Sequence, residues 1–497
     1  MIMRTVLLAT LLACLYNFSQ AQVLQPSAKP NAAQQRMIQR GYGMFIHFGI
    51  NTFADVEWSD GTLPVETYHP TQLDPDQWVR TARDAGFRYV LLITKHHDGF
   101  CLWDSKYTTY DVATSPVKTD VVKAVSDACK KYGLQFAIYY SLWDRHEPSY
   151  KDPDKQKYVD YMLHQLTELF TSYGNICELW LDGGWDRKPG EWGIDQVYQL
   201  VKKFNPNCAV SVNHTIVNEE GKRQATIPGE MTEDNKYFFQ YFPSDFRLWD
   251  PQMITRFDKK QYLHNGKSYY LPFEHTICIS DRWNWFEKSA QLPVRELDEL
   301  EELFYWSTDN NNCLVVNIPP DQTGRIREYT ALQAISLGKR LGLALNKPLP
   351  KNGRFISSHK PATATSVYAD PKNQYAAGAV NDGSLSSRWA AADKDTVATL
   401  EMELSPADAF NKISIFEYKD AKTLPDGFSQ IREPRIREYA VDILTNGVWE
   451  TIFMEAKPMG DCKVIRLPRS YHASRLRFRV IKATAPPSIY EINVIDK

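Results

Sequence analysis

Residues 89–105 read YVLLITKHHDGFCLWDS. The apolar run from Tyr89 to Ile93 has the length and composition of a buried strand, and it stops at two adjacent histidines, His96 and His97. Apolar runs that end in polar or aromatic side chains recur along the first half of the chain. The other endings read FIHFG at 45–49, AIYYSLWD at 137–144, LWLDGGWD at 179–186 and VSVNH at 210–214.

Short apolar strands alternate with amphipathic helical stretches between Arg40 and Leu341. Two of these stretches, 119–133 and 154–174, have helical spacing of apolar residues and end at glycine, which commonly stops a helix. Such alternation predicts an α/β fold with a parallel sheet, and the length suits a (β/α)8-like (TIM-type) barrel. The expected strands are Gly43–Phe48, Tyr89–Thr94, Gln135–Tyr140, Glu178–Asp182, Ala209–Asn213, Glu274–Ile279 and Cys313–Ile318.

Asp182 is the strongest single candidate for catalysis. In a (β/α)8 barrel the functional side chains lie at the carboxyl ends of the strands, so the five polar endings are expected to meet at one mouth. Asp182 ends an apolar run and stands between Trp180 and Trp185. A carboxylate among tryptophans suits the nucleophile of a glycosidase. Considered alone, the residue would fit a turn or a helix N-cap better, and the flanking tryptophans favour catalysis.

The chain divides into three parts. Residues 1–21 have a basic residue, an apolar stretch and a small-residue cleavage site, which predicts a secretory signal peptide. Residues 22–345 hold the barrel pattern. Residues 354–497 show alternating strands without a helical period, which predicts an antiparallel β-sandwich. The protein is therefore expected to be exported to the periplasm or secreted. Anchoring through a lipoprotein Cys14 is disfavoured because the apolar run continues past it.

The composition argues against several classes of partner and cofactor. A formal net charge of −2 offers no basic face for nucleic acid, and no apolar segment beyond the signal peptide is long enough to span a membrane. His96 and His97 would point to opposite sides of a strand, and no HExxH or Cys/His cluster occurs, so no metal and no cofactor are expected. The eight cysteines are scattered singly and suggest no pairing. Sequence does not indicate the oligomeric state.

Several motifs together resemble the α-L-fucosidases, glycoside hydrolase family 29. They occur in the family's order and cover about residues 35–341. The resemblance implies a barrel that removes terminal α-L-fucose with retention, with Asp182 as nucleophile. The motifs are YGMFIHFGINTF, VEW, TKHHDGFCLWDS, AIYYSLWD, LWLDGGWD and NNNCLVVNIPPDQTGRI. The implied substrate contacts are His47, Glu57, Trp58, His96, His97, Tyr140 and Trp180.

The acid/base of this family resides on a variable loop, and three acidic residues compete for the role. Asp250 in PSDFRLWDPQ ranks first, Glu274 in YYLPFEHTICIS second and Glu230 in IPGEMTED third. Many members carry an arginine shortly after the fifth strand, whereas this chain has Asn213-His214-Thr215. That departure puts the details of the sugar subsites in question.

The sequence thus predicts an exported retaining α-L-fucosidase that acts on fucosylated oligosaccharides or glycoconjugates without a cofactor. One alternative is a related retaining exo-glycosidase such as an α-L-galactosidase, and another is a non-catalytic carbohydrate-binding protein on a decayed barrel. The C-terminal part resembles discoidin-like carbohydrate-binding modules through VNDGSLSSRWAA and REYAVDILTNGVWETI. Because all the motif residues precede it, a chain ending near Leu345 is expected to keep activity on a small fucoside.

Overall fold

Eight parallel strands form a barrel in the computed structural model. The strand order is β5-β4-β3-β2-β1-β12-β11-β8, and a parallel bridge between Asn213 and Leu248 joins the two outer strands. The described residues are 26–218, 237–249, 256, 260–280, 283–287, 293–423 and 430–497. The barrel strands are β1 (Tyr42–Ile46), β2 (Tyr89–Lys95), β3 (Gln135–Ser141), β4 (Ile176–Asp182), β5 (Ala209–Val212), β8 (Arg247–Trp249), β11 (Phe273–Cys278) and β12 (Cys313–Asn317).

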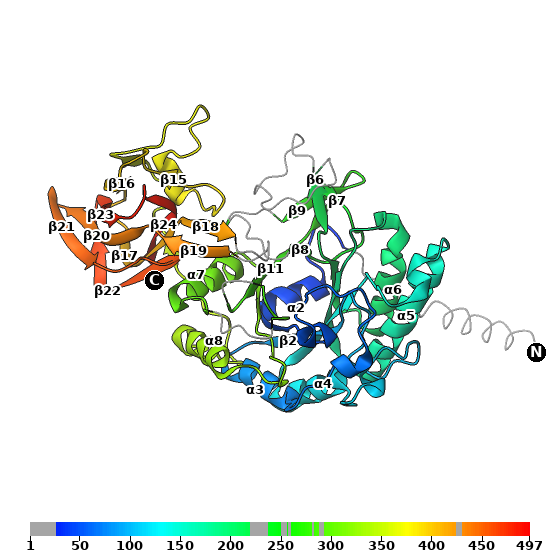
Figure 1. Ribbon diagram of the computed structural model, residues 1–497. Coiled ribbons are helices and arrows are strands. Elements are labelled where there is room, and N and C mark those ends of the chain that lie inside the picture. The colour runs from blue at the N-terminus through cyan, green and yellow to red at the C-terminus, as the bar shows by residue number, and fades with distance from the viewer. Residues whose placement is uncertain are drawn as a thin grey trace, which may run out of the picture.

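Helices surround the barrel on the outside (Figure 1). They are α3 (Pro75–Asp84), α4 (Val121–Tyr132), α5 (Lys155–Ser172), α6 (Ile194–Phe204), α7 (Leu297–Thr308) and α8 (Glu328–Leu341). Two connections carry short strands in the described residues. They are β6 (Ile216–Asn218) and β7 (Tyr237–Phe239) between β5 and β8, and β9 (Gln261–His264) and β10 (Lys267–Tyr270) between β8 and β11. The predicted barrel of alternating strands and helices is thereby confirmed.

Each barrel strand is buried on both faces, which explains why the strands read as continuous apolar runs. On β2, Leu91 and Ile93 pack inside the barrel, whereas Val90 and Leu92 pack against the helices outside. The same alternation applies to β3, where Tyr139 points inward and Tyr140 outward. Position within the pleat therefore decides which side chains can reach the barrel interior.

Helix α2 (Ala32–Arg40) covers the amino-terminal end of the barrel. Its N-cap Asn31 forms a capping box with Gln34, and Gly41 ends the helix with a φ of 50°. Such caps satisfy backbone groups that a short helix would otherwise leave unpaired. Met37 packs into the interior cluster of the barrel, and Arg40 is buried below it. The barrel is thus closed at this end and accessible only from the opposite one.

The C-terminal part forms two packed antiparallel sheets (Figure 1). One has the order β13-β24-β17-β22, with β15 also paired to β24, and the other has the order β14-β16-β23-β20-β21. A hairpin of β18 (Lys419–Thr423) and β19 (Gln430–Pro434) lies beside them. The sheet strands are β13 (Arg354–Phe355), β14 (Ala362–Ala364), β15 (Trp389–Ala390), β16 (Ala398–Glu403), β17 (Ala409–Glu417), β20 (Ile436–Thr445), β21 (Val448–Glu455), β22 (Cys462–His472), β23 (Arg475–Ala483) and β24 (Ser488–Asp496). The predicted β-sandwich is confirmed.

Helix α7 joins the barrel to the sandwich. Its ten residues from Glu299 to Thr308 are all buried, although four of the helix's residues are acidic in its first half. Lys412 of β17 lies 2.9 Å from Glu301 and 2.5 Å from Glu302, and Arg466 of β22 also pairs with Glu301. Trp306 meets Phe416 at 5.9 Å between ring centroids. The seventh barrel helix is therefore stabilised by residues of the sandwich.

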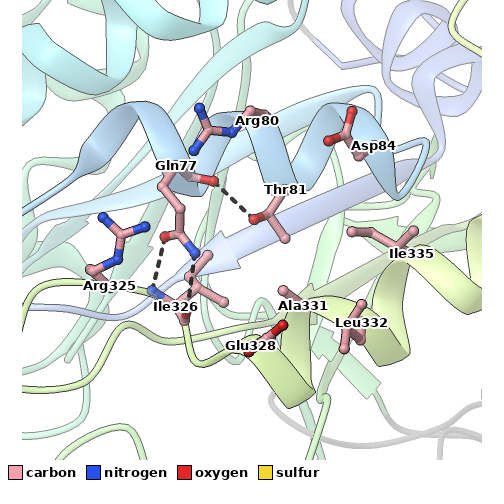
Figure 2. Close-up of a pocket in the computed structure, with 10 residues that line it drawn as sticks. All are labelled: Gln77, Arg80, Thr81, Asp84, Arg325, Ile326, Glu328, Ala331, Leu332 and Ile335. Atoms are coloured by element: carbon pink, nitrogen blue, oxygen red, sulfur yellow. Dashed lines mark hydrogen bonds between the residues drawn. The ribbon is translucent and has the colours of Figure 1, made fainter.

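A groove of about 450 Å³ lies on the outer surface between α3 and α8. Figure 2 shows that Gln77 bridges the two elements there, because its side-chain amide donates to the carbonyl of Ile326 at 2.9 Å and accepts from the Ile326 N–H at 3.0 Å. This contact ties the first barrel helix to the segment that precedes the last one. None of the predicted site residues lines this groove, so it is not the candidate site.

The seven cysteines in the described part of the chain are all free and buried. Each therefore serves as a small apolar core residue. No helix among the described residues is both long and apolar enough to cross a bilayer. The expected signal peptide, residues 1–21, lies outside the described residues.

Candidate active site

A cavity of about 100 Å³ lies at the carboxyl ends of the barrel strands. It collects side chains from β4 and from the segments that follow β1, β2, β4, β5 and β11, as expected for a (β/α)8 barrel. Seven of the predicted site residues line it together. The lining residues are His47, Glu57, Trp58, His96, His97, Trp180, Asp182, Trp185, Asn213, His214 and Trp283.

Asp182, the last residue of β4, receives three hydrogen bonds. The Tyr139 hydroxyl donates to Oδ2 at 2.9 Å, and Oδ1 accepts from the Asn213 side chain at 3.1 Å and from the Gly183 N–H at 2.8 Å. The carboxylate is 8% exposed, so its remaining free surface faces the cavity. Gly183 has a φ of 81°, and a Cβ there would lie 2.7 Å from Trp143. Only glycine fits this position, which lets the chain turn away and leaves the carboxylate accessible.

Two histidines present an acceptor nitrogen to the cavity. Nδ1 of His47 lies 2.9 Å from Oδ1 of Asn317, an atom that can only accept, so His47 carries its proton on Nδ1. Nδ1 of His97 lies 2.7 Å from the Ser141 hydroxyl, which already donates to the Trp143 carbonyl. His97 is therefore protonated on Nδ1 as well. Both Nε2 atoms are then free to accept a hydrogen bond from a ligand hydroxyl.

Three of the four histidines that line the cavity, His47, His96 and His97, are neutral at ordinary pH. Burial lowers the pKa of His97 to about 3, and it lowers the pKa of His47 and of His96 well below the usual value of 6.5. Charging an imidazole in this enclosed space costs solvation that no partner restores. The cavity thus recognises its ligand by hydrogen bonding rather than by positive charge.

His96 and His97 lie on the same side of the chain, contrary to the strand argument from sequence. Strand β2 ends at Lys95, so the alternation of a strand no longer applies, and the two ring centroids are 4.1 Å apart. Both rings line the cavity. Within the described residues no group of three or more His, Cys, Asp or Glu side chains is arranged to hold a metal ion.

Glu57 and Trp58 reach the cavity from the loop after β1. The side chain of Asn51 holds this loop, because it donates to the Glu57 carbonyl at 2.7 Å and to Asp98 at 3.0 Å. Burial, opposed by a hydrogen bond from Trp283 and reinforced by the charge of Asp182, raises the pKa of Glu57 to about 7. Glu57 is therefore a weaker acid than an exposed glutamic acid, and it keeps its proton in mildly acidic solution.

Tryptophans form the rim of the cavity. Trp58 is 46% exposed, and its ring lies 5.8 Å from Trp185 and 6.0 Å from Trp143, measured between centroids. The guanidinium of Arg145 stacks over Trp143 at 4.1 Å and donates to the Trp58 carbonyl. Exposed aromatic rings that are held in this way offer flat apolar surface next to polar groups. Such a rim suits the apolar faces of a sugar ring.

Two predicted site residues do not line the cavity. Tyr140 points out of the barrel, where its hydroxyl contacts Lys95 and Gln165, and the neighbouring Tyr139 points inward instead. Glu274 lies near the start of β11 and is fully buried below the cavity. The sequence analysis expected both side chains at the mouth of the barrel, but their positions within β3 and β11 place them elsewhere. The other two acid/base candidates, Asp250 and Glu230, lie outside the described residues.

Comparison with known proteins identifies the family. The α-L-fucosidase family model matches residues 52–342, more than half of the chain. The chain belongs to the α-L-fucosidase family. It is 29% identical to α-L-fucosidase 1 of Arabidopsis thaliana over 92% of this chain and 86% of that protein.

Solved structures of glycoside hydrolase family 29 share the fold of this α-L-fucosidase over nearly its whole length. The crystal structure of SpGH29 covers 95% of this chain and 99% of its own, with a TM-score of 0.54 and 23% identity. A Ruminococcus gnavus family 29 fucosidase in complex with fucose covers 96% of this chain and 98% of its own, with a TM-score of 0.50 and 21% identity. The protein is therefore a glycoside hydrolase that removes fucose.

The sequence analysis did not predict the contacts that two residues make in the α-L-fucosidase pocket. Trp283 lies in the segment between β11 and α7, where no periodic pattern marks it, yet its ring meets His47 at 4.5 Å. Asn213 was expected at the mouth as part of the VSVNH ending, but its hydrogen bond to Asp182 was not predicted. Its position one residue beyond the end of β5 was the available signal, since strand ends carry the functional groups of a barrel.

Proposed function

We propose that the protein is an exported, retaining exo-α-L-fucosidase in which Asp182 is the nucleophile. The observation that carries this proposal is the setting of the Asp182 carboxylate. Three donors hold it at the end of β4, and its open side faces a cavity lined by neutral imidazoles and indoles. A nucleophile of this kind must be fixed in direction while one oxygen stays free to attack.

The reaction is a double displacement. Asp182 attacks the anomeric carbon of the α-fucoside, the bond from that carbon to the glycosidic oxygen breaks, and the acid/base protonates the departing oxygen. The resulting β-linked fucosyl ester on Asp182 is then attacked by water, whose proton the same acid/base removes. Two inversions at the anomeric carbon release α-fucose. The neutral Nε2 atoms of His47 and His97 accept hydrogen bonds from sugar hydroxyls throughout.

Asp250 is our proposed acid/base. It is the next residue after Trp249, which ends β8, and residues in this position of a barrel follow the strand into the mouth. Glu230 is a second candidate on the connection between β5 and β8. Glu57 must also be considered, because it lines the cavity and holds a proton up to a pH of about 7.

Replacing Asp250 by Ala should slow the hydrolysis of natural fucosyl-oligosaccharides far more than that of a nitrophenyl fucoside. A good leaving group departs without a proton, so the first step survives and the fucosyl-enzyme accumulates. Azide should then speed turnover and yield α-fucosyl azide, since it attacks the β-linked intermediate from the opposite face. If Glu57→Ala or Glu230→Ala shows this pattern and Asp250→Ala does not, the role moves to that residue.

The kcat/KM of the enzyme should fall as the pH rises above about 7. Glu57 has its pKa raised to about 7, so it is a neutral hydrogen-bond donor below that pH and a second carboxylate beside Asp182 above it. Glu57→Gln keeps a neutral donor at every pH and should shift or abolish the alkaline limb. The measurement is the pH profile of kcat/KM for a nitrophenyl fucoside. An unchanged limb in Glu57→Gln would show that another group titrates there.

The cavity favours fucose over α-L-galactose, which has the same stereochemistry with a hydroxyl in place of a hydrogen on C6. Three indoles, those of Trp58, Trp180 and Trp283, provide apolar surface that can cover a methyl group. A buried hydroxyl without a partner would cost about 1–3 kcal/mol. Rates on matched nitrophenyl fucoside and galactoside test this, and proton NMR of the first-formed sugar anomer tests retention. Equal rates on both glycosides would contradict the assigned substrate.

Export is proposed from residues 1–21 alone, because they have the basic, apolar and small-residue regions of a signal peptide. A mature chain would then begin at Gln22 in the periplasm or outside the cell, where fucosylated glycans are accessible. N-terminal sequencing of the exported protein checks the cleavage site. An intact Met1 on exported protein would exclude this cleavage.

A further inference from the structure

A buried cluster of charged residues lies below the cavity, at the amino-terminal end of the barrel. Arg40 of α2 forms an ion pair with Glu178 of β4, and the carboxyl group of Glu274 of β11 lies next to that of Glu178. Tyr89 of β2 donates its hydroxyl to Oε2 of Glu274 at 3.0 Å. Both carboxyl groups are 0% exposed. The helix α2 and the strands β2, β4 and β11 thus bring two acidic side chains and one cationic side chain together in the barrel interior.

The geometry implies that Glu274 is a neutral carboxylic acid. Arg40 balances only one negative charge, and a second buried carboxylate without a cation would be very costly. Among the described residues, Oε1 of Glu178 accepts no hydrogen bond, and a proton on the neighbouring Glu274 would satisfy it. Burial and the neighbouring Glu178 also raise the pKa of Glu274 well above its usual value. The protonated acid therefore donates to Glu178 and accepts from its other neighbours.

One of those neighbours is a wall of the active site. The indole N–H of Trp180 donates to Oε1 of Glu274 at 2.9 Å, and Trp180 lines the cavity beside Asp182. The same indole stacks on Tyr139 with 5.4 Å between ring centroids, and Tyr139 donates to Asp182. A continuous set of contacts therefore leads from the buried cluster to the nucleophile.

We propose that Glu274 is a positioning residue, which fixes the indole of Trp180 from below and thereby holds the floor of the fucose pocket and the Tyr139–Asp182 contact. Only the contact between Tyr139 and Asp182 depends on the proposed role of Asp182 as nucleophile. The contact between Glu274 and Trp180 is independent of that role. Glu274 cannot protonate a leaving oxygen, because Trp180 lies between it and the cavity. It thus acts on the reaction through another side chain.

The decisive comparison is Glu274→Gln against Glu274→Met. Glutamine keeps an oxygen that accepts from Trp180 and an N–H that donates to Glu178, so its kcat/KM should stay within about threefold of the parent. Methionine fills a similar volume but has no oxygen to accept from the indole, and kcat/KM should fall by about 10- to 100-fold, mostly in kcat. The fall should be the same for a nitrophenyl fucoside and for a natural oligosaccharide, and azide should restore nothing.

Tyr89→Phe is the matched control. It removes the other hydrogen bond to the same carboxyl group but leaves the Trp180 contact in place, so kcat/KM should change by less than about threefold. Trp180→Phe tests the contact from its opposite end and should give the loss seen in Glu274→Met. Trp180→Phe also tests the proposal if Glu274→Met fails to fold. Circular dichroism and thermal denaturation would reveal such a failure.

A double-mutant cycle separates positioning from general damage. Once Trp180→Phe has removed the indole N–H, Glu274→Met should lower kcat/KM little further, because both changes break one contact. Losses that simply multiply would overturn the proposal. It would also be overturned by full activity of Glu274→Met or Trp180→Phe, or by a loss that depends on the leaving group and is rescued by azide. That last result would instead make Glu274 the acid/base and would leave Asp182 as nucleophile unaffected.

Discussion

Asp182→Asn should lower kcat on a nitrophenyl fucoside by on the order of 10³-fold or more while the protein still folds. Asparagine keeps the size of the side chain and one acceptor oxygen, so the bonds from Tyr139 and Gly183 can persist in part. It cannot supply the carboxylate oxygen that forms the fucosyl ester. Steady-state kinetics give the loss, and circular dichroism with thermal denaturation verifies the fold.

Two further variants make this prediction specific. Asp186→Asn is the matched control, because Asp186 lies four residues further on and contacts Tyr150 rather than the cavity, so its kcat should change little. In Asp182→Gly, azide can enter the vacated space and attack the anomeric carbon directly, which should yield β-fucosyl azide. A 2-fluoro-fucosyl inhibitor that labels a peptide without Asp182 would contradict the assignment.

A chain that ends at Leu345 should fail to form a stable, active barrel, in contrast to what the motif positions alone suggest. Removal of the sandwich deletes Arg466, one of the partners of Glu301, and Lys412, which pairs with both Glu301 and Glu302 of α7. It also exposes Trp306, which packs on Phe416. Breaking a buried ion pair by loss of one partner costs about 3–5 kcal/mol, a large share of the stability of a typical domain. Activity of the purified fragment on nitrophenyl fucoside and its thermal unfolding provide the test.

A point substitution isolates the same interaction in the full-length chain. Lys412→Ala leaves Glu301 and Glu302 buried together without their shared cation and should lower the free energy of unfolding by about 3–5 kcal/mol. Arg354→Ala is the control, because Arg354 pairs with Asp408 and Asp496 on the surface, where such pairs contribute little. A truncated chain that unfolds cooperatively near the parent temperature would show that the barrel does not need the sandwich.

Sequence reasoning located seven barrel strands because each is buried on both faces and therefore reads as an apolar run. It missed β8, whose three residues, Arg247–Trp249, are too short for any period and lie in a stretch interpreted as a loop. That strand closes the barrel against β5. Strand β8 ends directly before Asp250. Because the sequence pattern did not reveal this strand, it could not show where Asp250 lies relative to the end of a strand.

The errors at single residues come from register. Tyr139 and Tyr140 are adjacent and chemically identical, and only the pleat of β3 decides which of them faces Asp182. Glu274 was ranked from its motif, although the expected strand Glu274–Ile279 already put it at the start of β11, at the opposite end from the mouth. The amino-acid composition of such a strand does not show which of two adjacent residues points into the barrel, because strands that are buried on both faces lack an alternation of polar and apolar residues.

The dependence of α7 on the sandwich sets an order of events during synthesis. Helix α7 lies between β11 and β12 in the chain. Arg340 of α8 pairs with its Asp298 and Glu301, but its other partners, Lys412 and Arg466, belong to β17 and β22, more than a hundred residues later. Glu302 of α7 is paired with Lys412, so the barrel cannot bury this acidic residue with its cation until the ribosome has made most of the chain. The catalytic half of the nascent α-L-fucosidase therefore stays incomplete while the sandwich is still being made, a state in which exposed surface invites chaperone binding.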